Sequence, residues 1–234
     1  MSTRVASLLL GACLAANAWL QGEPSKQEYA LRGRYVMRSD NAAAKWPTHL
    51  HVLPLLVVPD GVRSTGAGSE GAPNGEFILR DVFGPRVLRR GYTLDQGSRW
   101  WPAEVLLDGV DITDVPTDFS MKLGAKLEVV FTQHPARIEG TVTTDGVTPA
   151  AGAWVLLLSA NPALWHEATI EKTQADGQGR FSYAVRAGRH LVVAIPSTPY
   201  QVRPVLTNVP ALAARATSVT VKDRERLSVQ LRLP

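Results

Sequence analysis

Apolar and polar residues alternate with a period of two along most of this sequence, and this feature constrains the fold most. Between residues 227 and 233 every second residue is a leucine or a valine, and the residues between them are polar. Leu127, Val129 and Phe131 also recur at every second position, as do Ile138, Gly140 and Val142. A helix would instead repeat its apolar residues about every 3.6 positions. The chain is therefore predicted to be all-β, with one apolar and one polar face on each strand.

Short segments of the same character recur between turn residues along the rest of the chain. They are Tyr29–Val36, His49–Val58, Glu76–Val82, Val87–Leu94, Glu104–Leu107, Ala153–Leu158, Arg180–Val185, His190–Ile195 and Ser218–Val221. Short strands at this spacing predict two tandem antiparallel β-sandwiches, as in immunoglobulin-like folds. One short helix is expected at Pro210–Ala216, which is alanine-rich behind a proline. Gly61–Asn74 is predicted to be a flexible loop.

A weak internal repeat divides the chain into two units. Gly33 is followed 44 residues later by Phe77, and Gly140 is followed 41 residues later by Phe181. Each phenylalanine comes after a polar, glycine-containing turn and is expected to start a strand that faces the core. The predicted units are residues 28–133 and 136–234, with Pro135 at the break between them.

The second predicted unit carries motifs that resemble a known family. These motifs are Ile138–Val142 (IEGTV), the turn and strand at Asp145–Val155, and the hairpin Thr173–Phe181 (TQADGQGRF). They are similar to carboxypeptidase regulatory-like domains, which are transthyretin-like β-sandwiches. The sequence departs from the family pattern at Arg186–His190, where only the glycine is kept.

The first predicted unit resembles a neighbouring repeat type of long bacterial secreted proteins, through Phe83–Arg86 and Gly109–Pro116. The resemblance implies accessory, carbohydrate-binding-like modules that support other domains. A fold of this kind does not fix a function.

The N-terminal residues predict export. Residues 1–18 have a short basic start at Arg4, an uncharged apolar run and a cleavage site at Ala16–Ala18, as in a signal peptide. Two alternatives stay open: lipidation at Cys13, and a retained membrane anchor, although the run is shorter than the ~20 residues that a spanning helix needs. The chain could also be a fragment of a longer multi-repeat protein. Cys13 is the single cysteine of the 234 residues, so no disulfide framework is possible.

Tryptophan side chains are the most suggestive candidates for a binding site. Trp100, Trp101 and Trp165 lie in loops or at strand edges. Aromatic rings exposed on a rigid sandwich can stack against the C–H faces of sugars. The alternative is that these rings close the ends of the sandwiches, while Trp154, within a strand pattern, is expected in the core.

Acidic and histidine side chains suggest metal sites only weakly. Asp108, Asp111, Asp114 and Asp118 could supply oxygen ligands for calcium, but their spacing is not that of a calcium loop. Turn capping is the simpler interpretation. His49 and His51 would face the same side of a strand, yet no third ligand is identifiable. No metal or other cofactor is predicted.

Other chemistry-bearing groups give no catalytic constellation. Ser69 lies in AGSEG, which lacks the first glycine of the nucleophile-elbow motif and its strand–turn–helix context. Five arginines lie close together in sequence and are expected on a solvated face: Arg80, Arg86, Arg89, Arg90 and Arg99. The net charge of +4 gives no reason to expect nucleic acid as a partner.

These observations predict a non-catalytic, extracytoplasmic binding or scaffolding protein of the cell envelope. The alternative is a carbohydrate-binding module that uses the tryptophans. The expected partner is an envelope protein or a carbohydrate, and membrane contact is expected only through the N-terminal segment, if that segment is uncleaved or lipidated.

Overall fold

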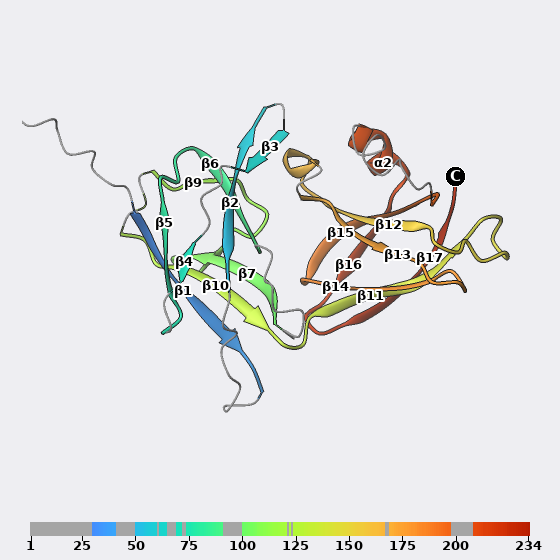
Figure 1. The fold of residues 1–234 in the computed structure, drawn as a ribbon, viewed down its shortest axis with the longest axis horizontal. Helices are drawn as coiled ribbons and strands as arrows, with labels where there is room; N and C mark the ends of the chain where they lie inside the picture. Colours follow the sequence, from blue (N-terminus) through green and yellow to red (C-terminus); the bar gives the residue numbers. More distant parts are fainter. Residues whose placement is uncertain are drawn as a thin grey trace, which may run out of the picture.

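The structure is a computed structural model, and Figure 1 shows its fold. It describes residues 30–40, 50–59, 61–64, 69–71, 74–90, 100–120, 122, 124–166, 169–197 and 208–234. Strands predominate, so the predicted all-β class is confirmed. The predicted signal peptide, together with His49 and Arg99, lies outside the described residues.

Two sheets make up the first unit, the name used here for residues 30–132. The larger sheet has the order β4-β5-β1-β10-β7-β8 and the smaller the order β3-β2-β6-β9. The strands are β1 (Ala30–Arg38), β2 (Val52–Val58), β3 (Gly61–Ser64), β4 (Glu70–Gly71), β5 (Glu76–Arg80), β6 (Pro85–Arg90), β7 (Trp101–Leu107), β8 (Val110–Asp111), β9 (Thr117–Asp118) and β10 (Leu127–Thr132). Both sheets contribute to one buried core, so the unit is a sandwich.

The second unit, residues 136–234, has the same plan with a third layer added. Its sheets have the orders β14-β11-β17 and β13-β12-β15-β16. The elements are β11 (Ala136–Thr143), β12 (Trp154–Ser159), η1 (Pro162–Leu164), β13 (Glu171–Gln174), β14 (Arg180–Val185), β15 (Gly188–Ile195), α2 (Val209–Arg215), β16 (Thr217–Val221) and β17 (Arg226–Arg232). In Figure 1 the two units lie side by side, with η1 beside β3.

Helix α2 forms the third layer and confirms the predicted helix. Asn208 caps it by accepting a hydrogen bond from the backbone N–H of Ala211. Val209 and Leu212 pack on the outer face of β12 and β15, in a second apolar cluster of this unit. This sheet is therefore apolar on both faces, which explains the continuous apolar run of β12.

The glycine–phenylalanine repeat is a structural repeat. Gly33 on β1 lies opposite Phe77 on β5, and Gly140 on β11 lies opposite Phe181 on β14. Both phenylalanines are buried, as predicted, at 1% and 5% exposure. A Cβ atom at Gly33 would lie 2.3 Å from Cζ of Phe77, so the ring occupies the space that a side chain would need.

One strand pair in each unit is parallel, whereas antiparallel sandwiches were predicted. β1 pairs in parallel with β10, and β11 pairs in parallel with β17; the other strand pairs of the named strands are antiparallel. The physical reason is that the first strand of each unit lies inside its sheet. The last strand returns to the free side of the first after the chain has crossed to the other sheet, and arrives in the same direction.

One expectation about local structure was wrong, and one strand was missed. Gly61–Asn74 is not wholly a loop, because Gly61–Ser64 forms β3 against β2 and Glu70–Gly71 forms β4 against β5. Val62 lies in a buried cluster and supplies the apolar contact that holds β3. Strand β13 was not predicted, because its sequence EKTQ has no apolar alternation; it is an edge strand held by β12.

No helix in the described part of the chain combines the length and the apolar character needed to cross a membrane.

Candidate functional site: the junction between the two units

An apolar contact anchors the second unit to the first. The single turn η1 extends from the end of β12, and its N-cap Asn161 accepts a hydrogen bond from the N–H of Ala163. Leu164 belongs to the second unit but packs against the first, on the outer face of the β3-β2-β6-β9 sheet, and is only 1% exposed. Its neighbours there are Leu53, Leu55, Val57, Val62 and Val87. This face of the smaller sheet is therefore covered by the second unit.

Asp114 of the first unit is the centre of a polar cluster beside this contact. One carboxylate oxygen, Oδ1, lies 2.7 Å from Nη2 of Arg89 in the same unit. The other, Oδ2, accepts a hydrogen bond of 2.8 Å from Oγ of Ser159 and forms an ion pair with Arg186, both in the second unit. The backbone oxygen of Asp114 accepts a third bond from the second unit, 2.8 Å from Nδ2 of Asn161. One aspartate thus joins both units through its side chain and its backbone.

The two arginines depend on this carboxylate. Burial and, to a smaller extent, the positive charge of Arg89 together lower the pKa of Arg186 to about 10. Burial likewise lowers the pKa of Arg89. Both guanidinium groups stay charged at neutral pH, and each is about one fifth exposed. Without Asp114 two partly buried positive charges would face each other, which is costly.

His190 lies next to the polar cluster, opposite Ser159 in the pairing of β12 with β15. It is 8% exposed, and its Nε2 lies 2.9 Å from the backbone oxygen of Arg186. Burial lowers the pKa of His190, and the charge of Arg186 acts in the same direction. The imidazole is therefore neutral near pH 7 and fixes the backbone that carries Arg186.

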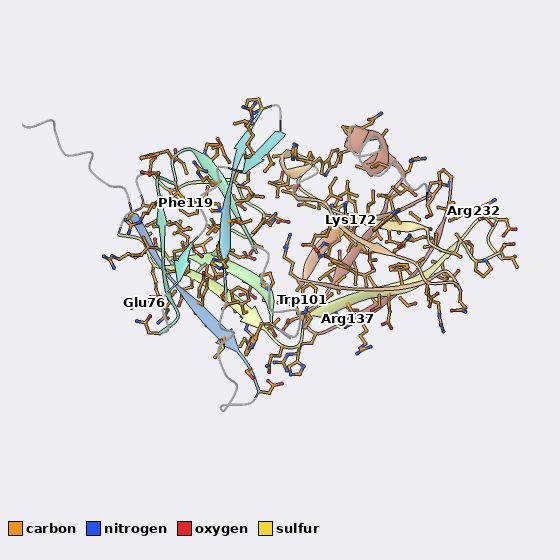
Figure 2. The ribbon with its side chains drawn as sticks, in the orientation of Figure 1. Glu76, Trp101, Phe119, Arg137, Lys172 and Arg232 are labelled. Carbon is orange, nitrogen blue, oxygen red and sulfur yellow. The ribbon has the colours of Figure 1, made fainter. Side chains whose placement is uncertain are left out.

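Further contacts join the units at the opposite side of the junction. The rings of Trp101 and Tyr183 meet edge to face, with centroids 6.2 Å apart. Asp40 pairs with Arg224 of the second unit at 3.0 Å, and this pairing lowers the pKa of the exposed Asp40 carboxyl. Figure 2 labels Trp101 and Arg137 close together, where the chain passes from one unit to the other.

The three predicted sugar-binding tryptophans do not form an exposed platform. Trp100 is 5% exposed and packs in the first core, which contradicts a role in stacking a sugar. Trp101 is half-buried against Tyr183. Trp165 is half-buried beside α2, and its Nε1 donates to the backbone oxygen of Ser159 at 2.9 Å. Carbohydrate binding through Trp101 or Trp165 stays a prediction.

The four aspartates suggested as metal ligands bind different protein groups in the structure. Asp108 accepts from the backbone N–H of Lys126, Asp111 from that of Thr113, and Asp118 from that of Ser120. Asp111 and Asp118 bond the backbone two residues ahead, which is the turn-capping role of the simpler interpretation. Asp108 instead bonds a backbone N–H 18 positions away, and Asp114 serves the junction. Among the described residues no group of three or more histidine, cysteine, aspartate or glutamate side chains could hold a metal ion.

Two of the arginines expected on a solvated face do not lie on one. Arg86 is buried, with hydrogen bonds to the backbone oxygens of Phe83 and Pro54, and Arg89 belongs to the junction. For these two the expectation was wrong, because a guanidinium can satisfy several backbone oxygens at once. The side chains of Arg90 and Arg99 lie outside the described residues.

Ser69 and His51 have structural partners. Ser69 is buried and lies 2.7 Å from the hydroxyl of Tyr35, while its Oγ accepts from the N–H of Val52. The Nδ1 atom of exposed His51 lies 3.3 Å from the backbone oxygen of Ser69. These contacts fix the entry to β2.

Sequence reasoning missed most of the junction. It singled out Asp114, but as a weak metal ligand, and it did not select Ser159, Leu164 or the role of Arg186. Two signals were available: a leucine inside the polar turn NPALW, and an arginine at position 186, where the family pattern changes.

No family model and no curated protein matches this sequence. Solved structures with a similar arrangement include the Bacillus anthracis TIE protein (12% identity, TM-score 0.31, covering 87% of this chain and 34% of that one). Another is a streptococcal ancillary pilin (12% identity, TM-score 0.32, covering 89% of this chain and 63% of that one). A third is the shaft pilin SpaA of Lactobacillus rhamnosus GG (7% identity, TM-score 0.31, covering 88% of this chain and 97% of that one). The chain thus spans less than two thirds of the length of the first two. TM-scores near 0.3 describe a coarse likeness that supports no statement about function.

Proposed function

We propose that this chain is a non-catalytic, extracytoplasmic binding or scaffolding protein of the cell envelope, built from two units similar to carboxypeptidase regulatory-like domains. The observation that carries the proposal is the junction around Asp114 and Leu164. A scaffold must hold its surfaces at a fixed separation and orientation. Neighbouring domains move relative to each other unless the interface between them is large and apolar. Here a buried leucine and a shared carboxylate oppose that motion.

The use of the titratable side chains supports a structural role. Asp114, His190 and Ser69 are each engaged with groups that hold the fold together. A general acid or base must instead reach a substrate from a cleft. The predicted signal peptide at residues 1–18 is the basis for the proposed location.

Location is tested by fusing the C-terminus of the full chain to alkaline phosphatase, which is active only outside the cytoplasm. We expect active fusions from the unaltered chain and inactive ones when Leu8, Leu9 and Leu10 are replaced by arginine. A fusion that is equally inactive with both sequences would refute extracytoplasmic placement. Substituting Cys13→Ser in parallel separates lipidation from simple cleavage, because only a lipidated chain would lose its membrane fraction.

A further inference from the structure

A hollow on the second unit has the size and lining of a ligand site. Its volume is about 450 Å³, within the ~300–1,000 Å³ range of small-molecule sites. Thr141, Thr143, Gln230 and Arg232 form its floor, and Val147 and Pro149 form a wall. Figure 2 shows Arg232 at the end of the second unit far from Trp101 and the junction. The hollow is thus separate from the site described above.

The parallel pairing of β11 and β17 brings the floor together. Thr141 lies opposite Gln230 and Thr143 lies opposite Arg232. The alternate residues, among them Val142 and Leu231, are buried in the core. Because side chains alternate between the faces of a strand, the hydroxyl, amide and guanidinium groups point to the outer face.

Asp145 stabilises the turn that forms the wall. Its Oδ1 accepts from the backbone N–H groups of Val147 and Thr148 at 2.8 and 2.6 Å, and its Oδ2 accepts from Oγ1 of Thr148. These bonds lower the pKa of Asp145 to about 2. The carboxylate is therefore occupied by its own turn, and the turn presents the Val147 side chain, 85% exposed, beside the polar floor.

Arg232 gives the hollow a positive charge. Its Nε makes one long bond, 3.5 Å, to the backbone oxygen of Thr144. A guanidinium has further N–H donors in a planar arrangement that suits a carboxylate. No acidic side chain is among the described residues that line the hollow.

The positive character continues along the outer face of the same sheet. Arg180 lies in the row of Thr141 and Gln230, and Arg137 lies opposite Arg226. Of these, Arg180 pairs with Asp176 at 3.1 Å, and Arg226 lies 3.7 Å from Glu139. On the described part of this face arginines outnumber carboxylates, so it suits an extended anion better than an isolated one.

We propose that the hollow binds an acidic polysaccharide, with the carboxylate of one sugar at Arg232, its hydroxyls at Thr141, Thr143 and Gln230, and a C–H face against Val147. This inference rests on the proposed role as an extracytoplasmic binding protein and names its ligand. The floor donates and accepts hydrogen bonds, as a polyol requires, and the wall offers apolar contact next to it. An acidic protein segment would use the charge but not this combination.

Calorimetric titration of the full chain with trigalacturonate tests the proposal, with the trimethyl ester as the matched neutral ligand. We expect saturable binding to the acid and binding at least about tenfold weaker to the ester, because a charge-assisted hydrogen bond is lost. Arg232→Gln should weaken binding of the acid by about tenfold. Arg189→Gln is the control, at an exposed arginine of β15 in the other sheet of the same unit, and should change the affinity by no more than about threefold.

Val147→Ser should also weaken binding of both ligands, whereas Val110→Ser, at an exposed position of the first unit, should not. Circular dichroism shows whether each variant is folded. Absence of binding by the folded chain, or equal losses in Arg232→Gln and Arg189→Gln, would overturn the proposal. Polyglutamate that binds as well as the sugar, with the same response to Arg232→Gln, would also overturn it and favour an acidic protein. None of these outcomes alters the location test, which addresses the proposed function separately.

Discussion

Asp114 of the first unit and Arg186 of the second form an ion pair across the junction, and the same carboxylate also binds Arg89. The three side chains are each about one fifth exposed. This geometry makes one aspartate responsible for two cations that come from different units. The stability of the whole chain should therefore be sensitive to this single position.

Replacement of Asp114 by alanine should lower the free energy of unfolding by about 2–4 kcal/mol, because it leaves two partly buried guanidinium groups without their shared carboxylate. Urea denaturation followed by tryptophan fluorescence measures the change. Arg224→Ala, which removes the exposed ion pair with Asp40 on the other side of the junction, is the matched control and should have little effect. Equal losses in the two variants would contradict the importance given to Asp114.

Leu164→Ala tests the apolar half of the junction. Leu164 is almost fully buried against residues of β2, β3 and β6, so truncation should cost about 2–4 kcal/mol through lost burial and a cavity. Thermal unfolding by calorimetry measures it and can also show the single transition separating into two. Val110→Ala removes methyl groups from an exposed position and should change stability by less than about 0.5 kcal/mol. A similar result for both variants would show that η1 does not anchor the second unit.

Gly33→Ala should destabilise the first unit, because the new methyl group would lie 2.3 Å from the Phe77 ring and would push it out of the core. The expected loss is about 1–3 kcal/mol, measured by urea denaturation. Gly140→Ala should cost more, since its Cβ would lie 1.8 Å from the backbone oxygen of Val229, which cannot move without breaking the β11–β17 pair. Gly124→Ala is the control, because a Cβ atom at Gly124 would lie more than 4 Å from the described atoms other than those of its chain neighbours. A harmless Gly33→Ala would contradict the close packing of this pair.

His190 predicts a pH dependence of the junction. Its folded pKa lies below the unfolded value of 6.5, so the unfolded state binds the proton more readily. The stability linked to His190 is complete above about pH 6.5 and is lost as the pH falls below that value toward the folded pKa. Unfolding free energies at pH 7.5 and 5.5 should therefore differ more in the unaltered chain than in His190→Gln. An equal change in unfolding free energy between pH 7.5 and 5.5 in the unaltered chain and in His190→Gln would refute the prediction.

The sequence was most informative where local and tertiary preferences agree. Alternation located β14 and β17 closely, and a proline before alanines located α2, because burial of one face decides such elements. The pairing of Gly33 with Phe77 was visible as a repeat, because the space for the ring must be provided by a glycine opposite it. The strands β4 and β13 could not be predicted from the sequence, because backbone pairing to a neighbouring strand, and not their own side chains, defines them.

The candidate site was less predictable than the fold. Asp111 and Asp114 have the same residue type and neighbouring positions, yet one caps a turn and the other joins two units. The difference depends on Arg186, more than 70 positions along the chain, and on the way the two sandwiches meet. Local spacing carries no information about such a long-range encounter. The burial of Trp100 has the same origin, since a ring in a loop becomes a core residue only when both sheets enclose it.

The rigid junction is tested most directly by the distance between one spin label on each unit. The labels are attached at Glu76→Cys on β5 and Ser228→Cys on β17, which are two exposed strand positions, in a chain that carries Cys13→Ser. Pulsed electron paramagnetic resonance measures the distance between them. We predict one narrow distance distribution, which broadens when Asp114→Ala and Leu164→Ala are combined. A broad distribution in the unaltered junction, or an unchanged narrow one in the double variant, would contradict the claim that these two residues hold the units together.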